Sequence, residues 1–152
     1  MSIFILSKTI AQLGLDQVYF KYVSENKPYF DVFFKNAIKF ISIIYLKVLV
    51  LVLVVAFFFS SKTGFYFILA TGVAYYFNSI DLANFFNEAK LLSKINVFSN
   101  TIGLVFALLL RYLVVVTEAD VLYLCIPIIA MTIIPFSIKL YIYKKSYSKN
   151  GK

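Results

Sequence analysis

The chain has 152 residues, of which 62% are hydrophobic and only 14% are charged, and its formal net charge is +8. Soluble domains are roughly 45–50% apolar and about 25% charged, so this chain has too few polar side chains for a water-soluble domain of its size. Its 17 Phe and 12 Tyr residues also exclude a disordered or collagenous chain, because such chains lack apolar surface to bury. The composition therefore predicts a membrane protein.

Residue types that are missing or rare limit the reactions and metal sites that this chain can support. The sequence has no His, the commonest general base and metal ligand, which argues against zinc hydrolases, His-based triads and haem proteins. Cys125 is the single cysteine and cannot form a disulfide within the chain. We find no phosphate-binding glycine loop, metal-ligand spacing or pair of carboxylates within an apolar run. We therefore expect no enzyme activity, no cofactor and no metal, and the interleaving of Lys with apolar runs argues against nucleic acid as a partner.

The first 13 residues are apolar but too short to cross a bilayer, which takes roughly 20 helical residues. A signal peptide would have a basic start and a small-residue cleavage site, and neither is present. Two interpretations stay open for this segment. It is either the last half of a helix whose beginning is missing, or an interfacial helix on the membrane surface.

Four later segments are long and apolar enough to cross a membrane as helices. The predicted fold is therefore all-α, with one membrane domain over residues 1–152 and a short apolar half-helix before the first span. The connection at 81–94 alternates polar and apolar residues, which predicts a short amphipathic helix at the membrane surface. The four predicted spans cover about residues 37–60, 63–80, 95–117 and 121–143.

Positive residues in the connections predict the topology, because cytoplasmic loops retain Lys and Arg. The connections 14–36 and 81–94 and the basic tail 144–152 together hold nine lysines, whereas the two short turns between spans hold only Lys62. We therefore expect both long connections and the C-terminus in the cytoplasm, with the two short turns outside.

Basic residues inside the predicted spans are the candidate functional groups, since a charge in the hydrocarbon core costs several kcal/mol, with scales running from about 3 to above 10. Lys39 and Lys139 lie near cytoplasmic ends, where a long side chain can reach the headgroups. Lys47 lies near the predicted midplane, where this is harder. Lys47 is therefore the strongest candidate for a side chain that faces a wet cavity.

The third span carries small residues every fourth position, at Ser99, Gly103 and Ala107. Such a stripe lets another helix approach closely, and Arg111 continues the series. We expect Arg111 to face protein or an internal cavity, although its length also allows it to reach the outer headgroups. In the fourth span, Pro127 and Pro135 predict helix kinks.

The order of these features resembles the polysaccharide (O-antigen) flippase family, which shares a transporter superfamily with the multidrug and toxin extrusion exporters. Members typically have a Gly-Leu-Asp-like turn after the second helix, seen here as Gly14-Leu15-Asp16. They also carry a Phe-Phe-Gln-x-x-x-Lys-like connection before the fifth helix, seen here as Phe85-Phe86-Asn87 followed by Lys90. Asn87 stands where Gln is usual, and the Pro often found ahead of that connection is absent.

The resemblance implies a function and a location. Such flippases move undecaprenyl-diphosphate-linked oligosaccharide across the bacterial inner membrane for O-antigen or capsule assembly. Membrane lipid and this lipid-linked oligosaccharide would be the partners, and Lys47, Arg111 and Lys39 would line a cationic, substrate-binding cavity. The family usually has about twelve to fourteen helices, and on this alignment Met1 falls inside the second. The chain would then be part of an N-terminal bundle resembling that of the extrusion exporters, inactive alone unless the remaining helices or other assembly proteins supply the rest.

Two other classes stay open. The chain could be a complete four-span membrane protein, either a helper in lipid-linked sugar transfer or a small exporter. The exporter would be expected to have an acidic residue in its first span, and none is visible. Alternatively, it could be an interaction protein whose basic tail binds anionic lipid or a partner.

Overall fold

The computed structural model describes the backbone of residues 2–25 and 30–150 and the side chains of 3–25 and 32–145. Over these ranges the chain is all-helical, without strands, as the composition and periodicity predict. Its elements are α1 (Ser2–Gln12), α2 (Leu15–Ser24), α3 (Phe30–Phe59), α4 (Lys62–Ser79), α5 (Leu82–Ala89), α6 (Ser93–Val116), a short 3₁₀ helix η1 (Val121–Leu124) and α7 (Cys125–Asn150).

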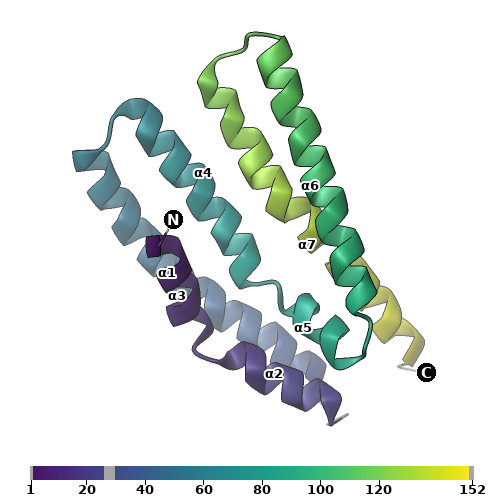
Figure 1. Cartoon of the computed structure of the whole chain (residues 1–152). Coiled ribbons are helices and arrows are strands. Elements are labelled where there is room, and N and C mark those ends of the chain that lie inside the picture. The colour runs from purple at the N-terminus through teal and green to yellow at the C-terminus, as the bar shows by residue number, and fades with distance from the viewer. Residues whose placement is uncertain (1, 26–29, 151–152) are drawn as a thin grey trace.

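Two antiparallel helical hairpins, α3–α4 and α6–α7, form the body of the molecule (Figure 1). Their turns lie at one end, whereas α2, α5 and the C-terminal end of α7 lie at the opposite end, which we call the base (Figure 1). The short helix α5 links the hairpins at the base. The connections with most of the lysines and the end of α7 thus share one end of the molecule, as the charge count requires.

The α3–α4 hairpin is held by aromatic side chains and by one close backbone approach. The Tyr45 hydroxyl, fully buried on α3, donates to the Gly72 carbonyl of α4 at 2.9 Å. A Cβ atom at Gly72 would overlap the end of the Leu49 side chain, so glycine leaves the space that Leu49 occupies between the two helices. Tyr76 adds a hydroxyl contact to Ser42 at 3.1 Å.

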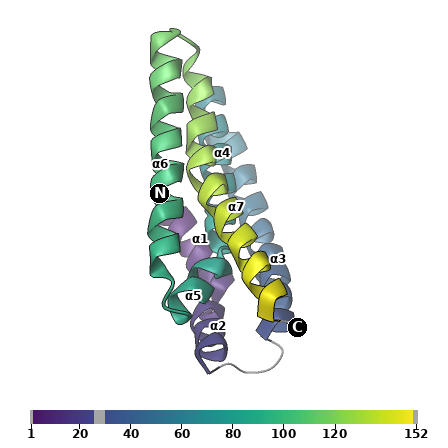
Figure 2. The ribbon, with the colours of Figure 1, turned by 90° about the vertical axis from the view of Figure 1, so that its right-hand side faces the viewer.

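The end of α7 returns to the start of α3 (Figure 2). There the rings of Phe34 and Tyr143 stack with their centroids 4.4 Å apart. The ring of Phe86 in α5 packs edge-on against Tyr143, with 4.8 Å between the centroids. These contacts bury the three rings and bring together α3, α5 and α7, which are far apart in sequence. Apolar contact therefore closes the base of the bundle.

The N-terminal helix α1 lies against α3 and α4 and ends in a sharp turn into α2 (Figure 1). Gly14 adopts a left-handed conformation with φ of 76°, which glycine reaches without strain. Gly14 was singled out above as part of the family-like Gly-Leu-Asp turn. Its local role is to end α1 and begin α2, which makes residues 15–24 helical within the predicted connection.

By length and composition, three helices can cross a membrane, over Val32–Phe59, Ser93–Val116 and Val121–Lys145. The sequence predicts four spans, and that number is not reproduced. The expected second span is α4, which has 18 residues and ends in the polar Asn78 and Ser79, so it is shorter and less apolar than the others. The structure forms the predicted helix between spans as α5. Met1 and residues 151–152 of the predicted tail lie outside the described residues.

Candidate functional site

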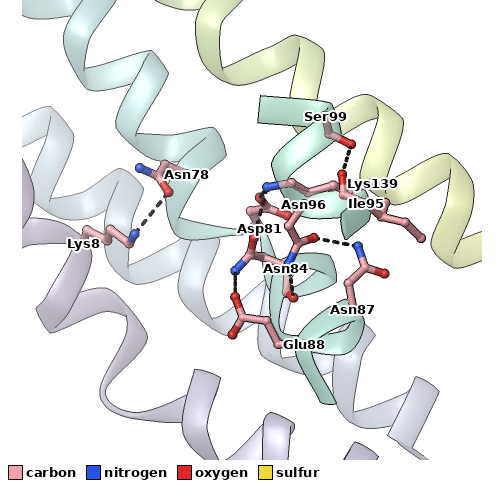
Figure 3. Close-up of polar contacts among 10 residues, drawn as sticks. All are labelled: Lys8, Asn78, Asp81, Asn84, Asn87, Glu88, Ile95, Asn96, Ser99 and Lys139. Atoms are coloured by element: carbon pink, nitrogen blue, oxygen red, sulfur yellow. Dashed lines mark hydrogen bonds and ion pairs between the residues drawn. The ribbon is translucent and has the colours of Figure 1, made fainter. Parts of the chain in front are cut away.

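An ion pair lies at the junction of α4, α5 and α7, at the base. Lys139 of α7 is 3% exposed, and its ammonium donates to Asp81 Oδ2 at 2.8 Å and to Asn84 Oδ1 at 3.2 Å (Figure 3). Lys139 was predicted to reach toward the cytoplasmic surface, and that prediction is wrong. Asp81 follows α4 directly and lies next to α7, so its carboxylate supplies the partner that a buried lysine requires.

Side-chain amides fix the corner between α5 and α6. Asn87 is fully buried and donates through Nδ2 to Asn96 Oδ1 at 2.8 Å. Asn96 in turn donates to the Asn84 carbonyl at 2.9 Å, and Asn84 donates to Glu88 Oε1 at 2.7 Å (Figure 3). Asn87, the position where the resembled family has Gln, therefore holds the start of α6 against α5.

Helix α1 contributes a second lysine on the other side of the junction. The Lys8 ammonium donates to Asn78 Oδ1 at 3.1 Å, and the Gln12 amide donates to the Ser79 carbonyl at 3.1 Å. Lys8 lies outside the three long apolar helices. Burial lowers the pKa of its ammonium below the ordinary value, and the nearby Asp81 carboxylate partly opposes this shift.

These groups surround a cavity of about 350 Å³ between α1, α4, α5, α6 and α7. Its volume is at the lower end of the range of small-molecule sites. Its lining combines apolar side chains with two ammonium groups, one carboxylate and several amides. The lining includes Lys8, Asn78, Asp81, Asn84, Asn100 and Lys139, with Phe77, Phe85, Met131 and Pro135.

The predicted cavity residues lie elsewhere. Lys39, Lys47 and Arg111 are all exposed, and none of them lines this cavity. Arg111 departs from the expectation that it faces protein. It lies one turn beyond Ala107, where α6 approaches its end at Val116, and its neighbours Tyr112 and Leu113 are exposed too.

The small-residue stripe lies in the contact between α6 and α7. Ser99, Gly103 and Ala107 are buried, and a Cβ atom added at Gly103 would lie 2.7 Å from Pro135 Cδ. The same Cβ would lie 3.2 Å from the Met131 carbonyl, which Pro135 deprives of its usual helical donor. The proline of one helix therefore fits against the glycine of the other.

The two prolines occupy different positions in α7. Pro135 lies inside the helix, whereas Pro127 is its third residue. Helix α7 follows η1 directly, so Pro127 lies where the 3₁₀ helix passes into the α-helix. The kink expected at Pro127 stays a prediction.

The site that the structure assembles was only partly visible in the sequence. The intramembrane position of Lys139 was a usable signal, because a buried lysine needs an acceptor, but nothing in the sequence indicated that Asp81, 58 positions away, would supply it. Lys8 was noted only as a charge within an apolar segment. Among residues 3–25 and 32–145, no three His, Cys, Asp or Glu residues cluster as a metal site would require.

Over residues 2–25 and 30–150 the fold is that of an all-helical protein, with three helices long and apolar enough to span a membrane. No protein-family model, no curated protein and no solved structure matches it.

Proposed function

We propose that the chain forms part of the helix bundle of a membrane transporter that moves lipid-diphosphate-linked oligosaccharide across the bacterial inner membrane. The sequence support is the resemblance carried by Gly14-Leu15-Asp16 and Phe85-Phe86-Asn87. In this proposal α4 also crosses the bilayer, because it runs antiparallel to the long helix α3 after a tight turn (Figure 1). The base then faces the cytoplasm.

The observation that carries the proposal is the position of two lysines on α3. Lys39 and Lys47 are exposed, on the helix face opposite the buried Tyr45 and Ile41. No described residue pairs with either ammonium. Lys47 lies 12 residues before the end of the 30-residue α3, too deep for a charge to be left in lipid.

A water-filled translocation path along this face would solvate both ammonium groups. It would also attract an anionic diphosphate headgroup. The outer face of α3 is therefore proposed as one wall of that path. Further helices, on other chains or on the rest of a longer protein, would form the opposite wall.

The test is complementation. The full chain is expressed in a bacterium whose O-antigen flippase lacks the corresponding N-terminal helices, and surface polysaccharide is measured. We expect the chain to restore surface polysaccharide. Lys47→Glu should abolish the restoration at an equal membrane level of protein, because it places a repelling carboxylate in the path. Lys94→Glu, a reversal of an exposed lysine at the base, is the matched control and should retain it.

Failure of the wild-type chain to restore polysaccharide would contradict the proposal. A self-contained helper in lipid-linked sugar transfer, a small exporter or an interaction protein with a basic tail would then be the better account. If the wild type and Lys47→Glu restore surface polysaccharide equally, the α3 face does not line the transport path.

A further inference from the structure

The cavity at the base contains hydrogen-bond donors that the described residues leave unused. An ammonium group has three N–H bonds. Lys8 donates one, to Asn78, and Lys139 donates two, to Asp81 and Asn84. Two N–H groups on Lys8 and one on Lys139 therefore have no acceptor among the described residues. Both side chains line the same cavity.

The cavity also lacks one donor. Asp81 lines it, and while Oδ2 accepts from Lys139, Oδ1 is buried and has no hydrogen-bond partner among the described residues. A buried carboxylate oxygen without a donor is costly. A ligand that suits this site must therefore present several acceptor oxygens to the lysines and one O–H group to Asp81.

The charges indicate the sign of the ligand. Lys8 and Lys139 carry two positive charges, and Asp81 carries one negative charge, so an anion would balance the excess. Carboxylate and sulfate anions supply only acceptors at neutral pH. A phosphate group that keeps one P–OH supplies both acceptors and a donor.

We propose that this cavity binds a protonated phosphate group, either as inorganic phosphate or as a phosphate monoester. The phosphate oxygens accept from Lys8 and Lys139, and the P–OH donates to Asp81 Oδ1. Asp81 then serves as the selectivity element, because sulfate has no proton to donate and would place an oxygen against the carboxylate. The cavity volume of about 350 Å³ leaves room for the organic part of a monoester.

This site is separate from the lysine face of α3 and uses none of its residues. The proposal does not require transport, because binding is measured on the purified full chain. A negative result in polysaccharide complementation would therefore leave it standing, and a negative binding result would leave the transport proposal standing.

The experiment measures equilibrium binding of radiolabelled inorganic phosphate to the full chain in an uncharged maltoside detergent. The measurements are made at pH 6, where roughly half of phosphate monoester groups keep a P–OH. Unlabelled sulfate and dihexanoyl phosphatidic acid, a soluble lipid phosphate monoester, serve as competitors. We expect saturable phosphate binding that sulfate displaces at least about tenfold less well than unlabelled phosphate.

Two variants and one control locate the binding. Lys8→Gln should weaken phosphate binding about tenfold, through loss of a charge-assisted hydrogen bond. Asp81→Asn keeps an oxygen for Lys139 but offers an amide N–H in place of the acceptor, so the preference for phosphate over sulfate should fall about tenfold. Lys94→Gln removes an exposed charge at the base, outside this cavity, and should bind phosphate as the wild type does.

The competitors also identify the source of the phosphate. Stronger displacement by dihexanoyl phosphatidic acid than by inorganic phosphate supports a lipid headgroup as occupant, and the reverse order supports a water-soluble phosphate. Absence of saturable binding would overturn the proposal. So would equal weakening by Lys8→Gln and Lys94→Gln, since that indicates a diffuse effect of surface charge.

Discussion

The polar junction at the base joins α5 to α6 and α7, whereas the helix contact between α6 and α7 holds one hairpin together, and the two regions use different physical means. At the junction, the stabilising groups are the Lys139–Asp81 ion pair and the amides around Asn87. In the α6–α7 contact, Gly103 fits against Pro135 by shape alone. The first region depends on ion pairs and hydrogen bonds between buried polar groups, and the second depends on the absence of a side chain. The two should therefore respond to different kinds of substitution.

The largest effect should follow from breaking the ion pair. Lys139→Met removes the partner of a carboxylate whose side chain is 13% exposed, and leaves Asp81 charged and uncompensated. Removing one partner of a buried pair typically costs about 3–5 kcal/mol, and we expect the free energy of unfolding to fall by about 3 kcal/mol. Thermal unfolding in detergent, followed by circular dichroism, measures the change.

The double variant Asp81→Leu with Lys139→Met is the decisive control. It removes both charges and should recover most of the lost stability, because the cost arises from the unpaired carboxylate and not from lost packing. If the double variant is as unstable as Lys139→Met alone, the junction is held by the shape of the lysine stem and the contrast between the two regions disappears.

A smaller loss is expected from filling the α6–α7 contact. Gly103→Val would place side-chain carbons where Pro135 and the Met131 carbonyl lie, and overpacking of this kind costs about 1–3 kcal/mol. Thr101→Val, which adds a similar side chain at an exposed position of α6, should leave the unfolding temperature almost unchanged. Equal stability of the two variants would show that α6 and α7 separate freely.

The smallest expected effect concerns the single hydrogen bond between Tyr45 and Gly72. Tyr45→Phe removes the hydroxyl and leaves the Gly72 carbonyl without this donor, which should lower the free energy of unfolding by about 1 kcal/mol. Tyr66→Phe, at an exposed tyrosine of the neighbouring helix, is the matched control and should be neutral. A neutral Tyr45→Phe would mean that ring packing alone holds the α3–α4 hairpin.

The sequence predicted the helical class, a short helix within the connection 81–94 and the placement of the lysine-rich connections at one end. These follow from local properties: composition, the spacing of apolar residues and the distribution of charge along the chain. The number of spans was predicted less well. Helix α4 has only 18 residues and is not among the three helices that are long and apolar enough to cross a membrane. The candidate site was the least well predicted part, since it combines residues of α1, α4, α5, α6 and α7.

The sequence by itself predicted an all-helical chain with helices long and apolar enough to span a membrane, a close helix contact at Ser99, Gly103 and Ala107, and lysines in unusually apolar surroundings. Only the tertiary structure decided which lysine is paired and which is exposed. Lys139 and Lys47 each lie within a predicted span, yet one is buried against Asp81 and the other lies on the outer face of α3. The physical reason is that the partner of a buried charge is chosen by the packing of helices distant in sequence, which local periodicity does not encode.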